Sequence, residues 1–206
     1  YHSRDSGRVA FPLLWLDVRH YLPLFADIVW AARLHGAYSA GQGRNHTLIL
    51  GGQENWLFQR EENRAQWGDP YFTTVVPVRG FPFGQRVGRH AFALSNELRV
   101  PLNRVFTNLL SARALYTLQW VTFLDAGLAW RRGNPLVDGS IIERDDFQSA
   151  NISISVETRR NAVIWSAGTG LRAIILGFTT RADVAWTSED GRLSPPRFLL
   201  SLGYDF

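Results

Sequence analysis

Apolar and polar residues alternate with a period of two in seven segments of the chain, which is the pattern of strands with one apolar and one polar face. In the last segment, the alternate positions from 198 to 206 are all apolar or aromatic, whereas most of the positions between them are small or polar. The other six segments are 14–18, 28–38, 92–100, 116–130, 163–175 and 178–186. The pattern predicts an all-β protein built on seven strands.

The connections between these segments alternate in length. Leu22 to Phe25 and the single Gly177 are short, and 101–113 is of moderate length. The long connections are rich in Gly, Asn, Asp, Arg and Pro, and they are 41–89, 131–162 and 189–196. In outer-membrane barrels the periplasmic turns are short and the extracellular loops are long. In such a barrel, this pattern of connection lengths places the C-terminus on the periplasmic side. A further alternating stretch at 152–157 indicates a hairpin that extends above the membrane.

Segment length favours a membrane barrel over a soluble antiparallel sandwich, which also has alternating strands. The segments run up to about 15 residues, whereas strands of soluble sheets average about 5 to 6. Their apolar faces carry Trp or Tyr near the segment ends, as an aromatic girdle does. These aromatic residues are Tyr38, Tyr116, Trp130, Trp165, Trp186 and Tyr204. Because seven strands do not close a bacterial barrel, we expect further strands before Tyr1.

Composition excludes several other classes of protein. The chain has 206 residues, and 46% hydrophobic with 19% charged residues is too apolar for a disordered segment. It has no apolar run near 18 residues, so the sequence predicts no transmembrane helix. The absence of Cys excludes disulfides and thiolate metal sites. The 22 basic residues are scattered among 18 acidic ones instead of forming a patch, so we expect no nucleic-acid partner.

Catalytic and metal-binding residues are not indicated. Some outer-membrane barrels are hydrolases that use His, Asp and Ser at the extracellular rim, so the histidines need to be considered. They are His2, His20, His35, His46 and His90, which fall on different strands or loops. None has a partner or a paired spacing that predicts a nucleophile, a base or a metal ligand. We therefore expect no enzyme activity, no metal and no cofactor.

Two short motifs carry the functional prediction. The first long connection contains Val78, Arg79, Gly80 and Phe81 in succession. A later strand contains the pattern F-x-D-x-G, in which all three defining residues lie on the polar face. They are Phe123, Asp125 and Gly127. An isolated R-G-F is common by chance, and Arg79 by itself would be interpreted as a solvated loop residue.

These motifs occur in the same order as in a known family of membrane barrels, together with Gly168, Gly170 and the terminal strand. They resemble the C-terminal part of the barrel in the BamA-type outer-membrane assembly and two-partner-secretion transporter superfamily. This superfamily is also called the bacterial surface antigen family. The resemblance spans nearly the whole chain. It implies a 16-stranded antiparallel transmembrane β-barrel that follows periplasmic domains, with residues 1–206 supplying about strands 10 to 16. It also implies that the long extracellular loop, 41–89, folds into the lumen, where Arg79 meets Asp125.

The resemblance further implies which residues hold the loop. Glu97 faces inward on the strand after the loop, and the inward glycines allow a close approach of the loop backbone. The residues expected in this contact are Val78, Arg79, Gly80, Phe81, Glu97, Phe123, Asp125, Gly127, Gly168 and Gly170. The loop also carries a Gly51–Trp56 stretch well before the arginine, and this insertion resembles a Bacteroidota-like subfamily of surface-antigen barrels.

The function implied by the resemblance is the insertion or translocation of other polypeptides, without covalent chemistry. Weak closure beside the last strand would offer an edge to client strands by β-augmentation. The strand residues expected to face lipid and to act as the assembly signal are Phe198, Leu200, Leu202, Tyr204 and Phe206. Expected partners are outer-membrane lipid and lipopolysaccharide, client polypeptides, and accessory lipoproteins or periplasmic proteins. The alternative is a passive porin or a structural surface barrel without protein cargo.

Overall fold

The computed structural model describes residues 12–40, 47–52, 72–74, 78–102, 117–131, 135, 140–149 and 152–203. The elements within these ranges are strands, apart from one short 3-10 helix, η1 (Phe25–Asp27). In these ranges no helix has the length and apolar character needed to cross a membrane. The all-β class predicted by the alternation is therefore confirmed.

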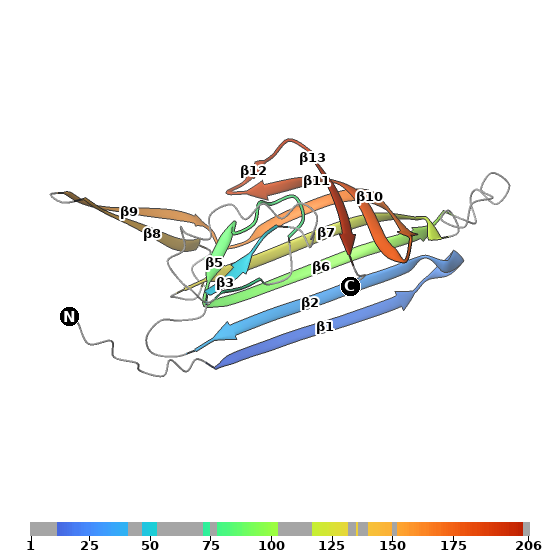
Figure 1. The fold of residues 1–206 in the computed structure, drawn as a ribbon, viewed down its shortest axis with the longest axis horizontal. Coiled ribbons are helices and arrows are strands. Elements are labelled where there is room, and N and C mark those ends of the chain that lie inside the picture. Colours follow the sequence, from blue (N-terminus) through green and yellow to red (C-terminus); the bar gives the residue numbers. More distant parts are fainter. Residues whose placement is uncertain are drawn as a thin grey trace.

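Most of the described chain forms one antiparallel sheet of eight strands, in the order β1-β2-β6-β7-β10-β11-β12, with β13 also paired to β11 (Figure 1). The seven long strands correspond to the seven predicted segments. They are β1 (Leu13–Pro23), β2 (Val29–Ser39), β6 (His90–Pro101), β7 (Gln119–Trp130), β10 (Ile164–Ile175), β11 (Phe178–Glu189) and β13 (Arg197–Gly203).

The eighth strand of the sheet is β12 (Arg192–Leu193), a two-residue strand that the sequence analysis did not predict. It pairs with the end of β11 at Ser188 and Glu189, and β13 pairs with the same edge of β11 over Thr179 to Ala185. Pro195 and Pro196 lie between the two ladders, and proline has no N–H to donate to a ladder. The prolines therefore interrupt the pairing along this edge of β11, so that β12 and β13 form two separate ladders with it.

The two faces of the main sheet differ sharply in character. Residues paired across an antiparallel ladder share a face, so the β6–β7 register places Ser95 beside Asp125 and Glu97 beside Phe123. We call their face the inner face and the opposite one the outer face. Buried polar or charged side chains of the inner face are Arg33, His35, Ser95, Glu97, Arg99, Asp125, Ser166, Arg172, Asp183 and Thr187. Exposed apolar side chains of the outer face include Leu14, Val18, Trp30, Leu94, Trp120, Leu124, Trp165, Leu171, Trp186 and Leu200.

Three short strands come from the connection predicted as a long loop, and the alternation did not predict them. They are β3 (Thr47–Leu50), β4 (Phe72–Thr74) and β5 (Arg86–Gly88), in the order β4-β3-β5. Figure 1 shows β3 and β5 over β6 and β7, toward the end of the sheet from which β8 and β9 project. Leu48, Leu50 and Val78 form one buried apolar cluster with small residues of the inner face, including Ala91 and Ala93. This packing attaches the loop to the inner face.

A separate hairpin comes from the second long connection. It consists of β8 (Ser140–Ser149) and β9 (Ile152–Asn161), which pair only with each other among the described strands. The hairpin projects beyond the end of the main sheet (Figure 1). The alternation at 152–157 had predicted part of β9 and a hairpin at this place, but β8 was not predicted.

Candidate functional site

The candidate site begins at the turn formed by Val78, Arg79, Gly80 and Phe81. Val78 is fully buried and Phe81 is nearly so, and both belong to the apolar cluster beneath the loop. Gly80 has φ +86°, which L side chains rarely adopt, and a Cβ there would lie 2.7 Å from Cγ2 of Thr187. A glycine is therefore required where the turn approaches β11. The turn brings Arg79 against the inner face.

Arg79 and Asp125 form a bidentate ion pair. Nε of Arg79 donates to Oδ2 of Asp125 at 2.6 Å, and its Nη2 donates to Oδ1 at 2.7 Å. The backbone N–H of Arg79 also donates to Oδ2, at 3.3 Å. Arg79 is 6% exposed and Asp125 is 2% exposed, so water screens this pair weakly. The planar guanidinium matches both carboxylate oxygens in a way that an ammonium group does not.

Two further residues of the sheet complete this contact. The hydroxyl of Ser95 donates to Oδ1 of Asp125 at 2.5 Å and accepts from Nη2 of Arg79 at 3.1 Å. Phe123 places its ring centroid 3.6 Å from Cζ of Arg79, within the distance of a cation–π contact. The guanidinium is therefore hydrogen-bonded at its edge and covered by an aromatic ring on its face.

Glu97 links Arg79 to two more arginines. Its carboxylate accepts from Nη1 of Arg79 at 2.8 Å and from Nη2 of Arg172 at 2.9 Å, and it forms an ion pair with Arg99 at 2.8 Å. Glu97 is 1% exposed, so its charge depends on these partners. Burial alone lowers the pKa of Arg79, but the carboxylates of Asp125 and Glu97 raise this pKa above its ordinary value. The guanidinium therefore stays charged in its buried position.

Two glycines of the inner face make room for the loop and its partners. A Cβ at Gly127 would lie 2.7 Å from Cδ2 of Leu50 and 2.9 Å from Cγ2 of Val78, both in the loop. A Cβ at Gly168 would collide with the ring of Phe123 and with the carbonyl oxygen of Val184. Each position therefore needs glycine because another group occupies the space of a side chain.

Gly170 has a different neighbour from the one expected. A Cβ there would meet the carboxylate of Asp183 and the backbone of β11, and not the loop. Asp183 is 4% exposed, and its Oδ2 makes no hydrogen bond within the described part of the chain. Its negative charge acts on Arg79 through space. Gly170 therefore makes room for a charged residue of the neighbouring strand.

A second set of contacts ties the loop to the far edge of the sheet. The side chain of Gln85 donates to Oε2 of Glu189 at 2.5 Å, and Nη1 of Arg86 forms a short ion pair with Oε1 of the same carboxylate. Arg86 is 2% exposed. Nη1 of Arg197, the first residue of β13, donates to the carbonyl oxygen of Gly80 at 2.9 Å. The loop thus bridges β6 and β7 on one side and β11 and β13 on the other.

The residues expected in the C-terminal strand are only partly described. Leu200 and Phe198 lie on the outer face, with exposed fractions of 51% and 85%. Leu202 follows in the same alternation and pairs with Thr180. Tyr204 and Phe206 lie outside the described residues.

All ten residues expected to hold the loop lie within the described chain, and all but Gly170 are in or beside the contact that they were expected to form. The sequence analysis did not assign Ser95, Arg99 or Arg172 to the site. Their positions could have indicated them, because each is a polar residue that the alternation places on the inward face of a predicted strand. Nothing in the local sequence pairs Arg86 with Glu189, which is 103 positions away.

The chemistry of this arrangement is non-covalent. Its side chains are guanidinium and carboxylate groups that neutralise one another, together with one hydroxyl and one aromatic ring. In the described ranges, no group of three or more His, Asp and Glu is arranged to hold a metal ion. What the cluster does physically is to fix a loop to a sheet by charge-assisted hydrogen bonds, which are about twice as strong as neutral ones.

Comparison with protein-family models, with curated proteins and with solved structures finds no match for this chain.

Proposed function

We propose that this chain is the C-terminal part of an outer-membrane β-barrel that inserts or translocates other polypeptides. The membrane location is supported by the distribution of side chains on the main sheet. Apolar residues point out and remain exposed, as at Leu124 with 52% and Val18 with 50%, whereas Glu97 and Asp125 point in and are buried. In water this arrangement would expose a large apolar surface, which monomeric soluble proteins rarely do. Lipid against the outer face accounts for it.

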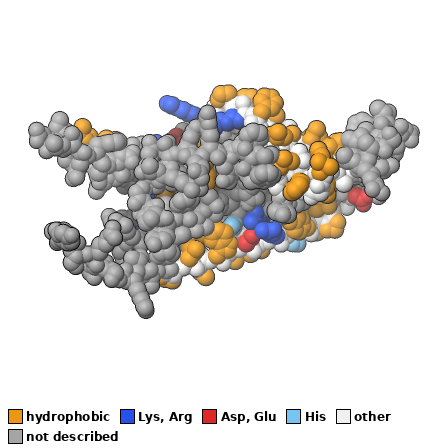
Figure 2. All heavy atoms as spheres, viewed as in Figure 1, with side chains coloured by type: hydrophobic (Ala, Val, Ile, Leu, Met, Phe, Trp, Pro, Cys, Tyr) orange, Lys and Arg blue, Asp and Glu red, His pale blue; other side chains and the backbone are white. Residues whose placement is uncertain are grey.

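Aromatic side chains on the outer face support the same location. Tyr38, Trp165 and Trp186 lie near the end of the sheet that leads into β8 and β9, and Trp30 and Trp120 lie toward the opposite end. Trp30 and Tyr38 are eight positions apart on β2, which is about 27 Å along a strand and about 21 Å along the membrane normal at a strand tilt of about 40°. The apolar band of an outer-membrane barrel is about 25 Å tall and has an aromatic girdle at each boundary. In the view of Figure 2, apolar side chains cover much of the described surface, and the charged side chains gather in small groups between them.

In this proposal, the barrel contains further strands in addition to the seven long ones. β1 is paired only with β2, and β13 pairs only with β11, among the described strands. Backbone groups of an edge strand need partners in hydrocarbon, so the sheet has to be closed in order to lie in a membrane. A barrel of 16 strands in all, with the β8–β9 hairpin on the extracellular side, fits the resemblance described above.

The contact between Arg79, Asp125 and Glu97 is the observation that carries the proposed activity. Removing three charged groups from water costs several kcal/mol of desolvation free energy. This cost is offset only because each group is paired with an opposite charge. None of these three residues lies on β13, so the contact can hold the loop while a weak closure of the barrel beside β13 opens to a client strand by β-augmentation. Arg197 joins the loop to the beginning of that same strand. The loop is therefore placed to support the strand at which a client would be added.

A passive porin is the competing proposal. A porin needs a continuous aqueous path, whereas here β3, β5 and the turn at Arg79 cover the inner face of β6 and β7. Nothing about a structural surface barrel requires Arg79 to be buried among carboxylates. Both alternatives predict no effect on the folding of other barrels, which makes them testable.

The test uses the natural polypeptide that carries this sequence, reconstituted in lipid vesicles. A urea-unfolded outer-membrane barrel is added as client, and its folding is followed by the change in its gel mobility. We expect faster client folding than in empty vesicles, and a loss of that acceleration in Arg79→Ala. The control is Arg19→Ala, which changes an arginine of β1 that is 40% exposed and is paired with Asp17. Ion conductance without any acceleration would identify a porin and overturn the proposal.

A further inference from the structure

The turn between β10 and β11 carries large apolar side chains on its surface. Leu176, at the tip of this turn, is 94% exposed, and Ile174, Ile175 and Phe178 beside it are also exposed. A Cβ at Gly177 would meet no atom within 4 Å. We call these four apolar residues the apolar turn. It lies at the end of the main sheet opposite to β8 and β9 (Figure 1).

Leu176 is an unfavourable residue for its backbone conformation. Leu176 has φ +52° and Gly177 has φ +85°, and a two-residue hairpin turn with both φ angles positive strongly prefers the sequence Asn-Gly. A bulky side chain is strained in this left-handed region. Because the side chain is almost fully exposed, packing within the described chain does not offset the strain. The position of Leu176 therefore indicates a role outside the folding of this hairpin.

Lipid against the outer face does not account for the apolar turn. Trp120, which lies toward the same end of the sheet, pairs with Leu171 in the β7–β10 register. Leu176 lies five positions beyond Leu171, which is about 16 Å along a strand and about 13 Å along the membrane normal at a tilt of about 40°. In the proposed orientation the tip therefore stands in water on the periplasmic side. Exposed apolar patches in water mark sites of interaction with other polypeptides.

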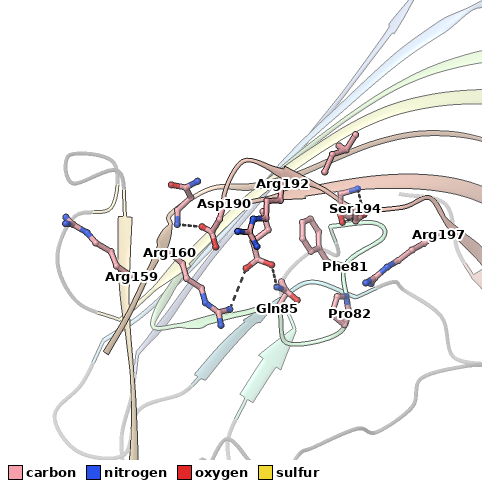
Figure 3. Close-up of a pocket in the computed structure, with 13 residues that line it drawn as sticks. Phe81, Pro82, Gln85, Arg159, Arg160, Asp190, Arg192, Ser194 and Arg197 are labelled. Atoms are coloured by element: carbon pink, nitrogen blue, oxygen red, sulfur yellow. Dashed lines mark hydrogen bonds and ion pairs between the residues drawn. The ribbon is translucent and has the colours of Figure 1, made fainter. Parts of the chain in front are cut away.

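The apolar turn borders one end of β13. Gly203, the last residue of β13, pairs with Thr179, which follows directly after the turn. The other end of β13 meets the loop, since Nη1 of Arg197 donates to the carbonyl oxygen of Gly80 at 2.9 Å. Figure 3 shows Arg197 near Pro82 of the loop. The loop therefore contacts the extracellular end of β13, and the apolar turn lies beside its periplasmic end.

We propose that the apolar turn binds the apolar side chains of an unfolded outer-membrane client before the client strand pairs beside β13. This role rests on the proposed function and adds a site of substrate recognition to it. Strands of such clients carry an apolar side chain at every second position, about 7 Å apart when extended. Main-chain hydrogen bonds beside β13 would give affinity for any strand, and apolar contacts with Leu176 and Phe178 would select this pattern.

The base of the turn is fixed, which suits a binding site. The backbone N–H of Ile174 donates to the hydroxyl of Thr117 at 2.9 Å, and Ile175 pairs with Phe178 across the hairpin. The apolar side chains are therefore presented on an ordered backbone, so binding does not have to order the turn.

The test measures peptide binding to the natural polypeptide in lipid nanodiscs by fluorescence anisotropy. The probes are a labelled ten-residue peptide of alternating Leu and Ser, and a peptide of the same length in which every Leu is replaced by Ser. The variants are Leu176→Asn, which removes the apolar side chain and suits the positive φ, and Leu176→Met, which keeps an apolar side chain. The matched control is Phe25→Asn. Phe25 is 79% exposed in the turn between β1 and β2, at the other side of the described sheet from β13.

We expect the alternating peptide to bind at least ten times more tightly than the all-Ser peptide. Leu176→Asn should weaken this binding at least fivefold and, at the same time, raise the denaturant midpoint of unfolding, because Asn is favoured in this turn. Leu176→Met and Phe25→Asn should bind the peptide as the unchanged protein does.

Three results would overturn the proposal. They are unchanged peptide affinity in Leu176→Asn, an equal loss of affinity in Phe25→Asn, and a lower denaturant midpoint in Leu176→Asn, which would mean that Leu176 serves the fold. Peptide binding is measured without any client folding, so the two proposals fail separately. Client folding that is accelerated but insensitive to Leu176→Asn would end this inference alone, and Leu176-dependent peptide binding without acceleration of client folding would end the proposed function.

Discussion

Replacing Asp125 by Ala removes the carboxylate that accepts three hydrogen bonds from Arg79. Breaking a fully buried ion pair by removing one partner costs about 3 to 5 kcal/mol, because the remaining charge is left without compensation. Here Glu97 stays within 2.8 Å of the Arg79 guanidinium and retains part of the compensation. We therefore expect a loss near the lower end of that range, about 3 kcal/mol in the free energy of unfolding.

The reverse change, Arg79→Ala, leaves Asp125 buried with only the hydroxyl of Ser95 as a described side-chain donor. We expect a loss of similar size, about 3 to 4 kcal/mol. The double variant Arg79→Ala/Asp125→Ala removes both charges together, so its loss should stay close to that of either single variant. The resulting coupling energy is about 2 to 3 kcal/mol, at the upper end of the range for residues in direct contact.

The assay is guanidinium-induced unfolding of the natural polypeptide in lipid vesicles, followed by tryptophan fluorescence, with hydrogen exchange to report on the loop. Arg19→Ala is the matched control, since Arg19 also pairs with an aspartate but is 40% exposed. An exposed pair contributes about 0 to 1 kcal/mol. Strictly additive losses in the double variant, or an Arg79→Ala loss no larger than that of Arg19→Ala, would refute the reasoning.

Three further outcomes are expected from the same structure. Leu124→Arg on the outer face should cost about 2 to 4 kcal/mol in lipid vesicles, and a change below about 0.5 kcal/mol would mean that water and not lipid meets this face. Gly80→Ala should destabilise more than Gly191→Ala in unfolding experiments, because both have positive φ but only the first would collide with β11 side chains. Glu189→Gln should speed hydrogen exchange around Arg86 while leaving the β6–β7 ladder protected, and unchanged exchange there would show that this ion pair does not hold the loop.

The strands of the main sheet follow from the sequence because alternation is a local property. A side chain on a strand points to the face opposite its neighbours, so the apolar phase of 116–130 and the polar phase containing Asp125 are visible without any knowledge of the partners. The inward positions of Phe123 and Gly127 follow from the same rule. The pairing of Arg79 with Asp125 was expected from the motif resemblance and not from the local pattern.

The short strands of the loop were not predicted, for a physical reason. β3 is buried at all four of its positions, so it has no polar phase and does not alternate. Its stability comes from packing on small residues of the inner face such as Ala91 and Ala93. A segment that is buried on all sides cannot be distinguished by periodicity from other short apolar runs.

By itself, then, the sequence determined the all-β class and the approximate positions and facing of the seven main strands, although β1 (Leu13–Pro23) is longer than the predicted segment 14–18. Only the tertiary structure decided which distant charges meet. Glu97 receives Arg99 from its own strand and Arg172 from a strand that is not adjacent to it, and Glu189 receives Arg86 from the loop. Such contacts depend on sheet order and curvature, which arise from the packing of the whole chain and leave no trace in the local alternation.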